Sequence, residues 1–71
     1  MNMTDKIQYI VALINEFAKR NNLTDAQAAE YLTRYNAIAL CERNYGYLHT
    51  QSFYSVINDL VAYCRRMGGT L

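Results

Sequence analysis

The chain reads Tyr45-Gly46-Tyr47-Leu48-His49-Thr50-Gln51 between two helical patterns. Glycine adopts a positive φ without a steric penalty, so Gly46 predicts a turn at this point. Thr50 is expected to cap the helix that follows, with Ser52 as the alternative cap. Leu48 is placed to pack against the first turn of that helix as a hydrophobic staple. The stretch therefore predicts a turn followed directly by a helix start.

His49 is the only histidine of the chain, and histidine is the side chain whose ordinary pKa lies near neutrality. We expect its ring to hydrogen-bond backbone groups in the turn or at the entrance of the next helix. Cys41 and Cys64 are isolated from it in the sequence, whereas zinc sites use close pairs such as C-x-x-C. The sequence also contains no Gly-rich phosphate loop and no nucleophile in a strained elbow. We therefore expect no catalytic residue, no metal and no cofactor.

The residues after the turn predict the most regular helix of the chain, over residues 51–67. Gly68-Gly69 follows as a C-cap, because glycine readily adopts the conformation that ends a helix. Apolar residues recur through this segment at helical spacing. They are Phe53, Val56, Ile57, Leu60, Val61, Cys64 and Met67.

The residues before the turn predict further helices. The first spans residues 5–20, with Thr4 as its N-cap and Asn21-Asn22 as its C-cap, because asparagine tolerates the left-handed conformation. The second begins at Thr24-Asp25-Ala26-Gln27, whose first and last residues match the capping box, and it ends at Asn36. Each of these two helices thus has a start signal and a stop signal of its own.

A short helix is predicted where the chain reads Ala37-Ile38-Ala39-Leu40-Cys41, which is apolar on every side. Such a helix is expected to be buried all round. A chain of 71 residues buries only about 60% of its unfolded surface, so no second domain fits. The prediction is one all-α domain over residues 1–71, a compact bundle of three long or medium helices plus one short buried helix.

Charge and composition exclude several classes of protein. The net charge is +1, and the seven Lys and Arg residues are scattered among acids, so no strong field for phosphate is present. Although 52% of the residues are hydrophobic, the longest apolar run is far shorter than the roughly 20 residues that cross a bilayer. The amino terminus lacks the pattern of a secretory signal, so we expect a cytoplasmic protein with no membrane contact. Cys41 and Cys64 are then expected to be reduced and buried.

The first and last predicted helices have wider apolar arcs than one neighbouring helix covers. One interpretation is that they sandwich the short helix and fill the core of a monomer. The other is that the extra apolar margin contacts a protein partner or a second copy in a homodimer. Seven tyrosines favour contact with another chain, because tyrosine combines a large area with a hydroxyl that stays wet at a rim. The interface candidates are Tyr9, Leu13, Tyr54, Val61 and Tyr63.

An alternative function is nucleic-acid binding by a helix-turn-helix. Residues 23–32 read like the first helix of such a unit. A recognition helix exposes polar side chains toward base edges, whereas residues 37–41 offer apolar surface. We therefore expect a protein partner rather than nucleic acid, and no enzymatic activity.

The order of these features resembles a family of small helical bacterial proteins, domain-of-unknown-function family 3791. The most specific part is Leu48-His49-Thr50-Gln51 after an aromatic turn, and Val56-Ile57-Asn58-Asp59-Leu60 resembles the isoleucine and acidic pattern of the family. The resemblance covers nearly the whole chain. The chain has Ser52 where the family often has glycine, and Gly46 where aspartate is common, so differences are expected in the turn.

The resemblance implies no established activity, catalytic residue or cofactor. It also implies a neighbouring gene for a second small protein of suspected toxin-like transferase activity. This chain would then be an antitoxin-like partner of the co-encoded protein. An antitoxin needs a complementary surface and no chemistry of its own, which agrees with the interface expected from the residues.

Overall fold

The computed structural model describes residues 3–71, and these residues form helices joined by short turns without any strand. The all-α prediction is confirmed, and the described residues contain one helix more than expected. The helices are α1 (Met3–Arg20), α2 (Asp25–Arg34), α3 (Ala37–Arg43), α4 (Tyr45–Leu48) and α5 (Phe53–Arg66).

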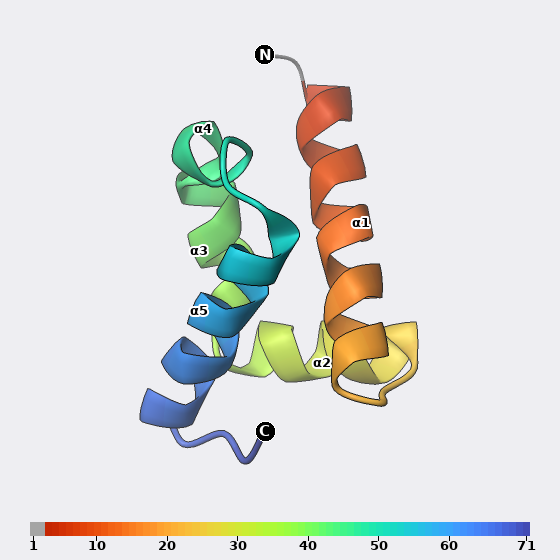
Figure 1. Ribbon diagram of the computed structural model, residues 1–71, viewed down its shortest axis with the longest axis vertical. Helices are drawn as coiled ribbons and strands as arrows, with labels where there is room; N and C mark the ends of the chain where they lie inside the picture. Colours follow the sequence, from red (N-terminus) through yellow and green to blue (C-terminus); the bar gives the residue numbers. More distant parts are fainter. Residues whose placement is uncertain (1–2) are drawn as a thin grey trace.

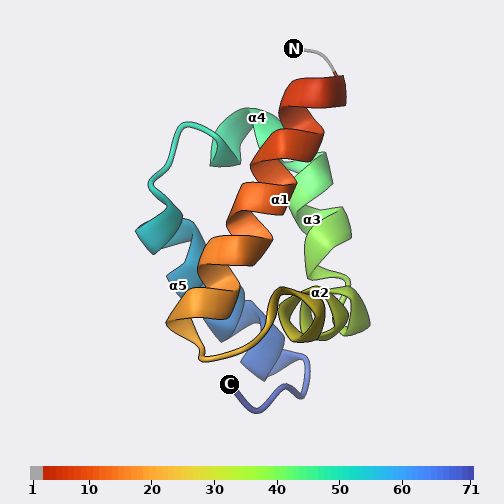
Figure 2. The ribbon, with the colours of Figure 1, turned by 90° about the vertical axis from the view of Figure 1, so that its right-hand side faces the viewer.

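Helix α1 is the longest helix and runs along the long axis of the molecule, as Figure 1 shows. Helix α2 lies across its C-terminal end. Viewed from the side in Figure 2, α3 and α5 lie behind α1 and to either side of it. Helices α2, α3 and α5 all contact α1, and α3 in turn contacts α2, α4 and α5.

The turn between α1 and α2 follows the sequence prediction. Asn22 has a φ of 56°, and the amide of Leu23 donates to the carbonyl of Ala18 at 2.9 Å, which closes the end of α1. Thr24 and Gln27 form the predicted capping box, with reciprocal bonds of 3.1 and 2.9 Å. The start of α1 differs from the prediction. The helix already includes Met3, so Thr4 lies inside the first turn and is not the N-cap.

Asn36 separates α2 from α3 with a φ of 60°, as its predicted role as a terminator requires. The following helix is not buried all round as predicted. Ala37 and Cys41 are buried, but Ala39 between them is exposed, and Ile38 is only half-buried. Because α1, α2 and α5 all contact α3 from the core, the opposite side of this short helix faces solvent.

The predicted turn at Gly46 is instead the short helix α4. Glycine with a positive φ occurs at Gly68 among the described residues and not at Gly46. The amides of Leu48 and His49 donate to the carbonyls of Asn44 and Tyr45, at 2.9 and 3.0 Å, and so close a helical turn. The Tyr45 side chain is 8% exposed, so burial of this ring at the start of α4 outweighs the conformational freedom of glycine.

The cap of α5 is Ser52, the alternative position, and not Thr50. The Ser52 hydroxyl accepts a 3.1 Å hydrogen bond from the amide of Ser55, and α5 begins at Phe53. The Thr50 hydroxyl instead donates to the carbonyl of Tyr47 at 2.6 Å. Thr50 therefore completes the end of α4 and leaves the start of the next helix to Ser52.

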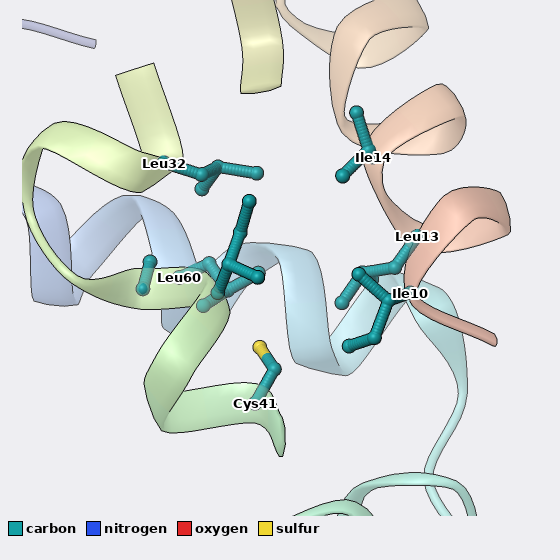
Figure 3. Close-up of a pocket in the computed structure, with 8 residues that line it drawn as sticks. Ile10, Leu13, Ile14, Leu32, Cys41 and Leu60 are labelled. Atoms are coloured by element: carbon teal, nitrogen blue, oxygen red, sulfur yellow. The ribbon is translucent and has the colours of Figure 1, made fainter. Parts of the chain in front are cut away.

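The core is a single apolar cluster to which all five helices contribute. Both cysteines lie in it as free thiols. A cavity of about 10 Å³ remains between α1, α2, α3 and α5, and Figure 3 shows side chains from all four pointing toward it. Its lining is entirely apolar, and its volume is at the lower limit for one water. The buried residues are Leu13, Phe17, Ala18, Ala28, Leu32, Ala37, Cys41, Tyr45, Val56, Ile57, Leu60 and Cys64.

The end of α5 is closed by two glycines with different constraints. Gly68 has a φ of 109° and donates to the carbonyl of Arg65 at 3.1 Å, while Gly69 donates to the carbonyl of Cys64 at 2.8 Å. These are the two bonds of a Schellman motif. A Cβ on Gly69 would lie 2.1 Å from the Tyr31 hydroxyl and 2.9 Å from the Cys64 carbonyl oxygen. The motif therefore needs glycine at both positions.

Replacing the cap residue tests the start of α5. Ser52→Ala leaves the Ser55 amide without its acceptor, and we expect a loss of about 1 kcal/mol in the free energy of unfolding. Urea denaturation followed by circular dichroism measures it. Ser55→Ala, the same change at an exposed position within α5, is the matched control, and an equal or larger loss in that variant would contradict the assignment of the cap.

A methyl group at Gly69 tests the close approach to Tyr31. We expect Gly69→Ala to lower the free energy of unfolding by about 1 to 3 kcal/mol, because ring and backbone must shift to admit the methyl group. Gly46→Ala is the control, since Gly46 is exposed and has no positive φ. Equal melting temperatures for the two variants would contradict this account.

Candidate interaction surface

Tyr9 is half-buried and joins α1 to the short helix α4. Its ring centroid lies 5.3 Å from that of Tyr45 and 5.4 Å from that of Phe53, both in edge-to-face geometry. Its hydroxyl donates to the carbonyl of Leu48 at 3.2 Å. Burial raises the pKa of the Tyr9 hydroxyl above its ordinary value. Ring and hydroxyl of this interface candidate are thus both engaged within the chain.

Leu13 does not lie at the exposed margin of α1 as predicted. It is 2% exposed and belongs to the core together with Phe17, one turn further along the same helix. Leu13 and Phe17 face the core, so the side of the apolar arc farther from them is the side exposed to solvent. Ile7 and Val11 are 54% and 60% exposed. The sequence analysis recognised the wide arc and assigned its free edge to the wrong side.

The exposed margin forms a continuous aliphatic surface, which we call the α1 stripe: Ile7, Ile10, Val11 and Ile14. Ile10 and Ile14 are half-buried and pack against the core. Figure 3 shows them pointing toward the small cavity, which Ile38 of α3 also lines. The stripe is therefore the outer edge of the core, and it is made of aliphatic side chains alone.

Tyr54 and Val61 lie on a second surface, on α5 near the end of α1. Tyr54 is 68% exposed, and the guanidinium carbon of Arg20 lies 4.6 Å from the centroid of its ring. Val61 is half-buried and lines a groove of about 360 Å³ together with Arg20 and Arg65. The structure thus brings two of the predicted interface residues next to two arginines that the sequence analysis did not select.

Tyr63 lines a third surface, a groove of about 300 Å³ between α3, α4 and α5. Its hydroxyl donates to the carbonyl of Tyr35 at 3.0 Å, which ties α5 to the end of α2. Tyr47, which the sequence analysis did not select, is 67% exposed at the same groove. Leu48 is half-buried there beside Val56, so it contacts the early part of α5 from within α4.

His49 is held by the helix that precedes it. Its Nδ1 lies 2.9 Å from the carbonyl oxygen of Tyr45, which accepts a hydrogen bond, and its ring stacks on that of Tyr45 with centroids 4.8 Å apart. This is a backbone contact of the kind predicted from the sequence. No group of His, Cys, Asp and Glu suited to a metal ion occurs within residues 3–71.

The two thiols are protonated at neutral pH. Burial raises the pKa of Cys41 to about 11, and it also raises the pKa of Cys64 above its ordinary value. A nucleophilic cysteine requires the opposite, a lowered pKa in a polar and accessible position. Both cysteines thus lie in the core, with the pKa of each thiol raised and not lowered.

The helix pair α2 and α3 exposes few side chains that could hydrogen-bond to the edges of nucleic-acid bases. The exposed side chains of α3 are Ala39, Glu42 and Arg43. A carboxylate beside a single guanidinium repels phosphate, and alanine offers no hydrogen bond to a base edge. The geometry of α3 therefore does not support the alternative prediction that this helix is the recognition helix of a helix-turn-helix.

The raised thiol pKa predicts a specific dependence of stability on pH. The contribution of Cys41 is fully present below its unfolded pKa of 9.0 and is lost as the pH rises toward about 11. We expect the wild-type free energy of unfolding to fall more steeply across this window than that of Cys41→Ala, by up to about 1.4 kcal/mol per pH unit. Urea titrations at several pH values measure the difference, and parallel curves would contradict it.

Within residues 3–71 no helix combines the length and apolar character that crossing a bilayer requires.

Comparison with curated proteins and with solved structures gives no significant match. The family model described as Protein of unknown function (DUF3791) matches residues 8–66 of the 71-residue chain. This range includes α2 to α5 whole and most of α1, so the chain belongs to this family of helical proteins.

Proposed function

We propose that this protein is an interaction module that binds another protein through the α1 stripe. The observation that carries the proposal is the exposure of Ile7 and Val11, two large aliphatic side chains one helical turn apart. They adjoin Ile10 and Ile14, which are only half-buried. Aliphatic side chains spaced in this way along one helix are the anchors that a partner's apolar groove or helix accepts.

The size of the stripe favours a concave partner over a pair of identical stripes. Full burial of one aliphatic side chain contributes about 1.5 to 3 kcal/mol, so covering the exposed halves of Ile7 and Val11 contributes roughly 2 kcal/mol. A micromolar complex requires about 8 kcal/mol. A partner with a groove would also cover the remaining exposed area of Ile10, Ile14 and Ile38.

The accessible area of the chain can be compared with the area of a standard protein interface. Standard interfaces bury about 800 Å² on each side. The described chain exposes 4553 Å², so such an interface would cover roughly a sixth of it. Patches of large aliphatic residues on a small protein are typical of protein contact sites. In the finer form of the proposal, the partner is the co-encoded protein and this chain is its antitoxin-like component.

The test replaces the stripe and its polar neighbours separately. The stripe variant is Ile7→Lys with Val11→Lys, and the control is Gln8→Lys with Ala12→Lys, whose positions are also exposed and one turn apart on α1. Each chain is tagged, co-expressed with the product of the adjacent gene and purified. We expect the stripe variant to bind at least about tenfold more weakly than wild type, because two ammonium groups would have to be buried.

Sedimentation of the isolated chain supplies the second arm. A wild-type dimer that the stripe variant abolishes and the control retains would identify the partner as a second copy. A stripe variant that binds as well as the control would overturn the proposal. So would a wild-type chain that stays monomeric and captures no neighbour. Circular dichroism checks that all three chains are folded.

A further inference from the structure

We propose that the groove between the end of α1 and α5 binds an acidic segment of a partner protein. We call it the arginine groove; its polar lining is Arg20, Asn21, Asn58 and Arg65, and its apolar lining includes Ile57 and Val61. Its volume is about 360 Å³, enough for a few side chains. Its lining includes two arginines and no side-chain carboxylate.

Both guanidinium groups are held in place by contacts within the chain. Arg20 donates through Nη2 to the side-chain oxygen of Asn58 at 3.3 Å and lies over the ring of Tyr54. Arg65 donates through Nε to the main-chain oxygen of Leu71, which occupies one edge of this guanidinium and leaves its Nη groups toward solvent. Within the part of the chain that the structure describes, neither arginine of the groove forms an ion pair with an Asp or Glu side chain.

The chemistry of the lining selects a carboxylate. Guanidinium groups bind carboxylates through two parallel hydrogen bonds, and positioned arginines lose less side-chain freedom on binding. The carbonyls at the end of α1 oppose an anion weakly, because those of Phe17 and Ala18 already accept bonds from Asn21 and Leu23. The positive charge of the groove is therefore available to a ligand.

The apolar lining of the groove, and the ring of Tyr54 beside Arg20, favour a polypeptide over a nucleic acid. Val61 and the exposed ring of Tyr54 offer contact area to side chains, and Tyr and Arg together are common at the centres of protein interfaces. Proteins that bind nucleic acid through the backbone typically make about 6 to 10 phosphate contacts. This groove has two cations, and the whole chain has a net charge of +1.

The arginine groove is independent of the α1 stripe. Of the groove residues, Arg20 is the last residue of α1 and Asn21 follows it. The stripe residues Ile7 and Val11 lie in the N-terminal half of the same helix. The variant Ile7→Lys with Val11→Lys leaves every residue of the groove unchanged. Failure of the proposed function and failure of this inference therefore give different results in the same set of variants.

Fluorescence anisotropy with a labelled peptide tests the inference. The probe is acetyl-Glu-Glu-Leu-Glu-Glu-Phe-amide, and the control peptide has Gln in place of every Glu. We expect binding of the acidic peptide to weaken about tenfold in Arg20→Glu and to weaken with added salt. Arg43→Glu, the same charge change at an exposed position of α3, should bind like wild type. The stripe variant should also bind like wild type.

Nuclear magnetic resonance of the unaltered chain keeps the test decisive if Arg20→Glu does not fold. Addition of the acidic peptide should shift the amide signals of Asn58, Val61 and Arg65 more than those of α3. The inference is overturned if the acidic peptide does not bind at millimolar concentration, if the Gln peptide binds equally, or if the shifts lie elsewhere. Tighter binding of single-stranded oligothymidine with the same dependence on Arg20 would assign the groove to nucleic acid instead.

Discussion

The direction in which α1 faces the core is the constraint on which the rest of the molecule depends. Phe17 and Leu13 are almost completely buried, and helices α2, α3 and α5 all pack on that side. A helix turns by about 100° per residue, so fixing these two side chains fixes every other position on α1. Tyr9 then meets the aromatic rings of α4 and α5, while Ile7 and Val11 remain in water. The exposed stripe is thus a consequence of how the core is built.

The connections between helices are short because side chains complete the helix ends. Asn22 and Asn36 adopt positive φ, and Thr24 and Ser52 supply the oxygen atoms that cap α2 and α5. The hydroxyls of Thr24 and Ser52 each accept a bond from a backbone amide that would otherwise need water. Within residues 3–71 this places most residues in a helix or its cap, and it brings the helices onto one core.

The proposed activities both concern recognition and differ in their physical basis. The α1 stripe offers aliphatic area and no charge, so its binding would depend on the removal of water from Ile7 and Val11. The arginine groove offers two positioned cations, Arg20 and Arg65, so its binding would depend on charge and would respond to salt. Neither proposed site uses His49, Cys41 or Cys64. The ring of His49 stacks on Tyr45, and both cysteines are buried in the core.

The sequence by itself determined the features that depend on neighbouring residues. The capping box at Thr24, the stops at Asn22 and Asn36 and the extent of the long helices all arise from bonds across one turn of chain. The family resemblance, which the match to residues 8–66 confirms, could likewise be read from local motifs.

Tertiary packing decided the remainder. Tyr45 packs against Tyr9 where a glycine turn was predicted, the segment forms α4, and Ser52 rather than Thr50 caps α5. The choice between the two margins of α1, and the meeting of Arg20 with Tyr54 and Arg65, required the helices to be placed in space. Periodicity shows how wide an apolar arc is, but only docking against other helices decides which edge of it water still reaches.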